Sequence, residues 1–220
     1  LGAGAMAKSI AADCKLAGRE VRMCELEQFA ERNFFQVEQR GIKLYGDQLN
    51  LNGFERSGTA HIDMITTDVA KAVKGAGLIV VATTALGHEP FFKMLVPALE
   101  DGQYVHIVPD NFGSFLLRKI MREMNCTKKV VIGGYTSGPY GTRVQNVGGV
   151  VMPVIKAYIR DYTFRGAALP ATDTAEFIES SKYLPCFDAI NNYGNMETGD
   201  TAFDNIFSNT NPVIHCPATI

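Results

Sequence analysis

The chain opens with Leu1-Gly2-Ala3-Gly4-Ala5-Met6-Ala7, which has the spacing G-x-G-x-x-A at the point where a strand would pass into a helix. The first glycine permits a tight turn, the second lets backbone N–H groups approach a pyrophosphate, and the small third residue lets helix and strand pack closely. The N–H groups around Gly4, Ala5 and Met6 then attract phosphate charge. This stretch therefore predicts a dinucleotide-binding turn.

The segment after the turn supports that interpretation. Met6, Ile10 and Cys14 recur at helical spacing, so one apolar stripe can lie on a sheet, and Gly18 ends the predicted helix. A short strand over 21–24 follows, and Glu25 stands at its end. This glutamate lies about twenty residues after the glycines, where a carboxylate accepts hydrogen bonds from an adenosine ribose.

The charge of Glu25 would repel a 2′-phosphate, so the sequence favours NAD(H) over NADP(H) as the cofactor. Two nearby cations, Arg22 and Arg32, would weaken this preference if either reached the ribose.

Composition excludes several function classes. The 220 residues carry 21 basic and 23 acidic side chains in a mixed pattern, with a formal net charge of −2, so we expect no nucleic-acid partner and no polybasic membrane contact. Apolar runs are too short for a bilayer span, and we expect a cytoplasmic protein. The five cysteines form no C-x-x-C pair and the four histidines lack ligand spacing, so we expect reduced thiols and no metal site.

Strands alternate with helices as far as residue 134, which predicts an α/β fold with a Rossmann-type, doubly wound parallel sheet. The apolar run 78–82 is typical of a buried parallel strand, and we expect it to end in a loop over 83–88. Ligands of such sheets bind at the edge where these strands end. Four residues there are candidate cofactor contacts: Thr83, Thr84, His88 and Asn111, the last also a candidate helix cap. Beyond residue 135 we expect antiparallel strands over 140–146, 150–158 and 161–164, then a helix over 173–183.

The C-terminal segment carries a resemblance to a known family. Asn209-Thr210-Asn211-Pro212-Val213-Ile214-His215-Cys216-Pro217 resembles the N-x-N-P-x-x-H-x-P segment of the opine dehydrogenases, which include octopine and nopaline dehydrogenase. The glycine turn, the stretch from Thr83 to Phe91 and Pro139-Tyr140-x-x-Arg143 agree with it. The resemblance implies a cofactor domain followed by a helical substrate domain. It also implies reduction of the imine formed from an α-keto acid and an amino acid.

His215 is the candidate catalytic residue and a candidate substrate contact. Asn211 is a good helix N-cap and Pro212 suits the first helical position, which places His215 near the positive end of a helix. That end disfavours an imidazolium, so a neutral imidazole is ready to accept a proton. Arg143 is a candidate for holding a substrate carboxylate through two hydrogen bonds, with a surface ion pair as the alternative.

We expect residues 1–208 to form the cofactor domain, with its first strand truncated, and 209–220 to begin the connection to a helical substrate domain missing from this sequence. Two alternative functions stay open. One is a keto-acid reductase of the same two-domain architecture, such as a ketopantoate reductase. The other is a non-catalytic module that senses NAD(H). A homodimer is one alternative for the oligomeric state.

Overall fold

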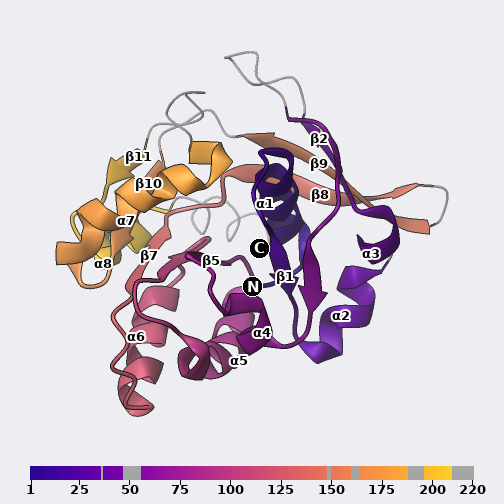
Figure 1. The fold of residues 1–220 in the computed structure, drawn as a ribbon. Helices are drawn as coiled ribbons and strands as arrows, with labels where there is room; N and C mark the ends of the chain where they lie inside the picture. The colour runs from indigo at the N-terminus through magenta and orange to yellow at the C-terminus, as the bar shows by residue number, and fades with distance from the viewer. Residues whose placement is uncertain (36, 47–55, 148–149, 160–163, 188–195, 210–220) are drawn as a thin grey trace, which may run out of the picture.

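A computed structural model describes residues 1–35, 37–46, 56–147, 150–159, 164–187 and 196–209 (Figure 1). Its central feature is a parallel sheet assembled around the first residues of the chain. Leu1 and Gly2 lie between two strands: the N–H of Ala82 donates to the carbonyl of Leu1 at 2.9 Å, and the N–H of Gly2 donates to that of Cys24 at 2.8 Å. The opening stretch thereby joins the two halves of the sheet.

On one side of this link lie β1 (Arg22–Cys24) and its parallel partner β4 (Met64–Thr66). On the other side lie β5 (Leu78–Val81), β6 (Tyr104–Ile107) and β7 (Val131–Tyr135), all parallel. The order β4–β1–opening stretch–β5–β6–β7 is the 3-2-1-4-5-6 order of the dinucleotide-binding fold. The prediction of a Rossmann-type sheet is therefore confirmed.

Helices cover both faces of this sheet. One face packs against α4 (Val69–Val73), α5 (Ala85–Leu95) and α6 (Gly113–Glu123), through side chains such as Phe91 and Leu117. The other face packs against α1 (Ala5–Leu16) and α7 (Thr174–Ser180). Two further helices, α2 (Glu27–Phe34) and α3 (Val37–Arg40), follow β1.

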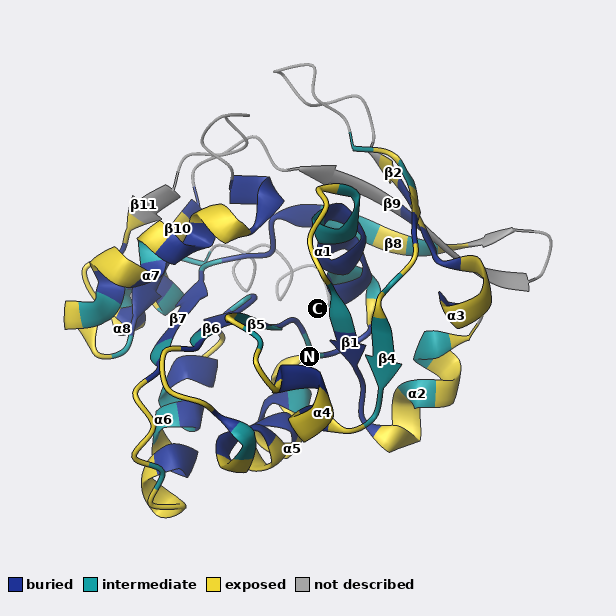
Figure 2. Cartoon of the chain, in the orientation of Figure 1, coloured by how far each residue is buried: buried dark blue, intermediate teal, exposed yellow. Residues whose placement is uncertain are grey.

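A second sheet covers α1. It has the order β3–β2–β9–β8, formed by β2 (Ile42–Gly46), β3 (Gly58–Ala60), β8 (Tyr140–Val147) and β9 (Val150–Ile159). Helix α1 lies between the two sheets, and most of its surface is buried (Figure 2). The predicted antiparallel pairing of 140–146 with 150–158 is confirmed.

The edge of the parallel sheet is extended by two more strands. β10 (Phe164–Ala168) runs antiparallel to β7, and β11 (Met196–Thr198) runs parallel to β10, with α8 (Ala202–Phe207) after it. Of the strand predicted over 161–164, residues 161–163 lie outside the described residues, and Phe164 is the first residue of β10. None of the described helices is long and apolar enough to cross a bilayer.

Several predicted boundaries were wrong. The stretch 83–88 is only briefly a loop, because α5 begins at Ala85 and includes His88. The helix predicted over 173–183 is α7 followed by a 3-10 turn over Ser181–Tyr183.

A buried polar cluster anchors α1. The carboxylate of Asp13 accepts hydrogen bonds from the guanidinium of Arg56 and, at 2.5 Å, from the hydroxyl of Tyr140 on β8. The hydroxyls of Ser9 and Thr142 add a second link between the same elements at 2.7 Å. Because unpaired buried charges are costly, this pairing fixes how α1 sits between the sheets.

A second buried network anchors α7. The hydroxyl of Tyr135 lies 2.7 Å from Nδ1 of His106 and 2.8 Å from the hydroxyl of Ser181, while Nε2 of His106 lies 2.8 Å from the hydroxyl of Ser180. Burial lowers the pKa of His106 to about 3, so the ring is neutral near pH 7.

We expect Tyr135→Phe to lower the free energy of unfolding by about 1–3 kcal/mol, because it leaves Nδ1 of His106 without its buried partner and removes one of the two hydrogen bonds of the Ser181 hydroxyl. Urea denaturation followed by circular dichroism measures this change. Tyr183→Phe, at a tyrosine that is 48% exposed, is the control and should change stability by less than about 0.5 kcal/mol. Equal effects of the two substitutions would contradict the assigned network.

Candidate functional site

The glycine turn has the backbone that its sequence predicts. Gly2 has φ +99°, and a Cβ atom at this position would lie 2.6 Å from the carbonyl oxygen of Ala82. Any side chain would therefore both strain the backbone and clash with the neighbouring strand end. Ala7, the third small residue of the turn, is buried in the core beside the sheet.

Gly4 has a different role, because its surroundings are open. It is the N-cap of α1, and among the described residues no side chain caps the helix and no atom would lie within 4 Å of a Cβ atom placed here. The first N–H groups of a helix have no acceptor within the helix. The backbone of Gly4, Ala5 and Met6 thus presents donors to an open space, which suits a phosphate group.

Glu25 lies at the end of β1, beside this turn, and is only 5% exposed. Its Oε2 accepts hydrogen bonds from the N–H of Ala3 at 3.0 Å and from the amide of Asn33 at 2.7 Å. Its Oε1 accepts one from the N–H of Leu26 at 2.8 Å. The carboxylate therefore braces the glycine turn itself, a role that spacing alone did not reveal.

Thr83 and Thr84 follow β5 at the same edge of the sheet. Thr84 is the N-cap residue of α5 but its side chain makes no capping hydrogen bond, and it is exposed. The hydroxyl of Thr83 packs on the first turn of α5, where a Cβ atom on Gly87 would lie 2.5 Å from it. Both threonines are therefore near the glycine turn, since Gly2 contacts the backbone of Ala82.

His88 is placed differently from the prediction, because it lies within α5 and is buried. Its ring stacks on Phe92 with centroids 5.3 Å apart, and a Cβ atom on Gly113 would lie 2.9 Å from the ring. Burial lowers its pKa, and Nε2 has no hydrogen-bond partner among the described residues. The ring of His88 thus packs against Phe92 of its own helix and against Gly113 at the start of α6.

The segment after β6 contains a residue that sequence reasoning missed. Asp110 is fully buried, and its carboxylate accepts hydrogen bonds from the N–H and hydroxyl of Ser114 at 2.7 and 2.8 Å. Asp110, two residues before the N-cap Phe112, therefore holds the first turn of α6, and the prediction of Asn111 as the helix cap is wrong. A Pro-Asp pair directly after a buried strand was the available signal.

Asn111 and Phe112 both have left-handed backbone, with φ of 44° and 64°. Non-glycine residues in this region carry strain of about 1 kcal/mol or more, and such strain gathers at functional edges. Asn111 is exposed and follows β6, whose C-terminal end lies at the same edge of the parallel sheet as that of β5.

The remaining candidates lie on the four-stranded sheet or outside the described residues. Arg143 is exposed on β8 and donates to the carbonyl of its neighbour Thr142 at 3.1 Å. His215 and its predicted cap Asn211 lie outside the described residues. Within the described residues no group of three metal-binding side chains comes together.

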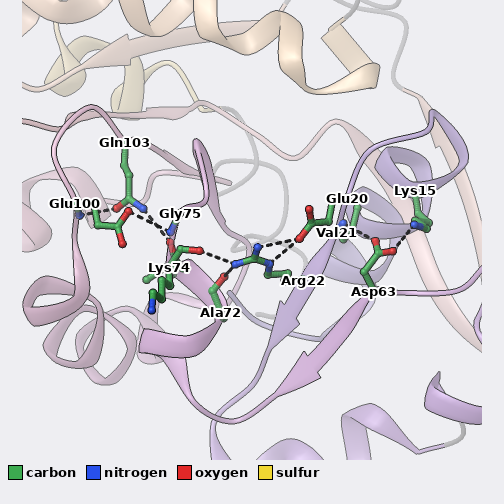
Figure 3. Close-up of polar contacts among 11 residues, drawn as sticks. Lys15, Glu20, Val21, Arg22, Asp63, Ala72, Lys74, Gly75, Glu100 and Gln103 are labelled. Carbon is green, nitrogen blue, oxygen red and sulfur yellow. Dashed lines mark hydrogen bonds and ion pairs between the residues drawn. The ribbon is translucent and has the colours of Figure 1, made fainter.

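A cavity of about 350 Å³ lies beside Leu1, lined by residues of α1, β1 and β5 and by Gly2 and Ala7 of the glycine turn. Ion pairs and hydrogen bonds surround it, including Lys15 with Asp63 at 2.6 Å and Arg22 with Glu20 at 2.8 Å (Figure 3). Arg22 also donates to the carbonyl of Lys74, at the C-terminal end of α4, at 2.6 Å. Gly4, where α1 begins, does not line this cavity, and the open start of α1 is the candidate site.

Comparisons with known proteins agree with this architecture. No family model matches the sequence. An opine dehydrogenase of Arthrobacter sp. (strain 1C) is 29% identical over 194 residues, which cover 87% of this chain and 50% of that protein. An opine dehydrogenase of Haliotis discus hannai is 24% identical over 135 residues, which cover 60% of this chain and 33% of that protein. These matches support the predicted similarity of this chain to the opine dehydrogenases. The chain spans about half the length of the first relative.

Solved structures show the same fold. Octopine dehydrogenase in complex with NADH and L-arginine superposes with a TM-score of 0.74 at 17% identity, over 96% of this chain and 50% of that one. A PanE/ApbA family ketopantoate reductase from Ralstonia eutropha JMP134 gives 0.58 at 16% identity, over 90% of this chain and 55% of that one. The Rossmann-like architecture is common to both.

The buried carboxyl at the candidate site generates a pH prediction. Burial raises the pKa of Asp110 from 3.8 to about 6, so the folded protein retains a proton that the unfolded chain releases. The raised pKa therefore lowers the free energy of unfolding as the pH rises from about 4 to about 6, by up to about 3 kcal/mol. Asp110→Asn should remove this loss, so the free energy of unfolding of the variant should rise relative to that of the wild type over that pH interval.

Urea denaturation at about pH 4 and about pH 7 measures the difference in stability between Asp110→Asn and the wild type. Asp200→Asn, at an exposed carboxylate, is the control. The raised pKa would be contradicted if the free energy of unfolding of Asp110→Asn, relative to that of the wild type, stayed constant or fell as the pH rises.

Proposed function

We propose that the chain is the NAD(H)-binding part of an oxidoreductase of the opine dehydrogenase type. The observation that carries this proposal is the open, uncapped start of α1 at Gly4, with Glu25 beside it at the end of β1. Together they supply what a dinucleotide needs: backbone donors for the pyrophosphate and a carboxylate for the adenosine ribose.

The residues present fit this cofactor. The backbone N–H groups of Gly4, Ala5 and Met6 would hold the pyrophosphate, and Glu25 would accept a ribose hydroxyl. Thr83, Thr84 and Asn111 are proposed contacts for the nicotinamide half, because they lie at the ends of β5 and β6. His88, buried between helices, would support that edge from beneath. When bound, NADH would supply the hydride.

We infer that His215 donates or accepts the proton in this reaction. In the reductive direction its protonated form would hydrogen-bond or protonate the substrate nitrogen, and in the oxidative direction its neutral form would accept a proton from the amine. Arg143 is proposed to hold the carboxylate of the α-keto acid. Solved octopine dehydrogenases are described with pyruvate and with L-arginine, which supports an α-keto acid and an amino acid as the substrate classes.

The chain matches only half the length of the first relative, so the whole activity is proposed for the longer protein. We propose that the other half supplies the amino-acid pocket and the carboxylate that orients His215. The runner-up function is a keto-acid reductase, which the similarity to ketopantoate reductase supports, at a lower TM-score than octopine dehydrogenase.

Gly4→Ala should abolish tight NADH binding while leaving stability within about 0.5 kcal/mol of the wild type. The new methyl group meets no protein atom within 4 Å, but it occupies the space that the pyrophosphate requires. Gly2→Ala is the matched comparison, because its methyl group would clash with Ala82 and reduce stability as well. Fluorescence titration with NADH and urea denaturation separate the two effects. Unchanged NADH affinity in Gly4→Ala would contradict the proposed site.

In the full-length protein, His215→Ala should lower the rate of NADH oxidation by about 10²–10⁴-fold while NADH affinity survives, because the histidine acts on the proton and not on the cofactor. The assay supplies pyruvate with and without a pooled amino-acid mixture. His61→Ala, at an exposed histidine, is the control and should retain full activity.

The same assay separates the competing functions. NADH consumption that requires the amino acids supports the opine reaction, whereas equal consumption without them indicates a keto-acid reductase. NADH binding without turnover, unaffected by His215→Ala, would indicate a sensor.

A further inference from the structure

Three phenylalanine rings form an aromatic patch on the surface: Phe112 at the start of α6, and Phe203 and Phe207 of α8. They are 46%, 56% and 66% exposed. The ring centroids of Phe112 and Phe207 are 5.9 Å apart, and those of Phe203 and Phe207 are 4.6 Å apart. Rings from two distant stretches of the sequence thus pack on one another at the surface, and contiguous exposed apolar groups of this kind mark interaction sites.

The backbone of Phe112 is strained in order to present its ring. This residue is the N-cap of α6 and has φ of 64°, a left-handed conformation that bulky side chains rarely adopt. Burial of the ring in the core would offset such strain, but almost half of the side chain stays exposed. Strain of this kind persists at positions with a function, so a role for the ring at the surface explains it.

Helix α8 holds the other two rings outward. Between them in the sequence lies Asn205, which is fully buried, and its amide donates to the carbonyl of Gly134 on β7 at 3.0 Å. Ala202 is buried on the same helix. Because these contacts fix the rotation of α8, Phe203 and Phe207, four residues apart, share its outer face.

Polar groups border the aromatic patch. Arg165 lies 3.8 Å from the carboxylate of Asp204 and donates to the hydroxyl of Ser208 at 3.2 Å. An aromatic centre with a polar rim is the usual composition of a protein interface. Phe112 also directly follows Asn111, a proposed contact for the nicotinamide half of the cofactor, so a partner on the patch would lie beside that site.

The size and position of the patch favour a tethered partner over a second copy of the chain. Three half-exposed rings offer much less area than the about 800 Å² that each partner contributes to a stable complex between free proteins. A covalently linked domain binds at high effective concentration, so a smaller surface is sufficient. The chain spans 50% of the Arthrobacter relative, and the described residues reach Asn209, two residues after Phe207.

We propose that the aromatic patch is the docking surface for the other half of the longer protein, and that it seats that half beside the nicotinamide end of the cofactor site. This inference rests on the second half given under the proposed function, and not on the identity of the cofactor.

Cysteine labelling of the full-length protein tests this inference. Phe207→Cys places a thiol in the patch, and Met124→Cys places one at the other end of α6, where the native side chain is 45% exposed. Mass spectrometry of peptides after maleimide treatment measures each site separately from the native cysteines. The thiol at position 207 should react at least about tenfold more slowly than the thiol at position 124, because access controls the reaction. Phe203→Cys is the second probe if the first variant does not fold.

The same labelling at about a hundredfold lower protein concentration distinguishes the tethered half from a second copy, because only association between chains weakens on dilution. Slow labelling that persists on dilution supports the docking surface. Equal labelling rates at the two positions overturn it, and protection that disappears on dilution also overturns it by assigning the patch to a second copy. An NADH titration of the same protein keeps the two proposals apart: persistent protection without NADH binding would contradict the proposed function alone.

Discussion

The parallel sheet depends on the backbone hydrogen bonds of Leu1 and Gly2, which connect β1 to β5. Without them the strands described here would form two separate sheets, one of two strands and one of five. The same residues begin the glycine turn, so the connection of the sheet and the geometry of the candidate cofactor site are set by one short stretch. Glu25 strengthens this dependence, because its carboxylate accepts the N–H of Ala3.

Helix α1 begins with the N–H groups proposed to hold the phosphate, and its position is fixed by burial on several sides. The parallel sheet packs on one side of it and the four-stranded sheet on another. The buried polar cluster of Asp13, Arg56 and Tyr140 holds its second half in place. A buried charge that loses its partner costs several kcal/mol, so the helix resists rotation or sliding. The open space at Gly4 is thus presented by a rigid element, as precise ligand binding requires.

Local signals in the sequence were sufficient for the backbone of the turn, for the position of Glu25 at the end of β1 and for the alternation of strands and helices, because each depends on spacing within some twenty residues. Signals that depend on distant partners were missed. The loop expected up to His88 is helical because α5 begins at Ala85, and His88 is buried against the glycine at the start of α6. Asn111 is not the cap of α6, because Phe112 takes the N-cap position and the Asp110 carboxylate accepts the N–H of Ser114, a contact that depends on how the backbone turns after β6.

The carboxylate of Glu25 has a structural role in addition to the ribose contact predicted from its spacing. Spacing assigns Glu25 to the ribose, but its hydrogen bonds show that it first stabilises the turn that would receive the pyrophosphate. A carboxylate oxygen can accept more than one hydrogen bond, so bracing the turn does not prevent it from accepting a ribose hydroxyl. Substitution of Glu25 therefore removes a support of the glycine turn as well as the proposed ribose contact, so the stability of the turn and the proposed cofactor binding depend on one side chain.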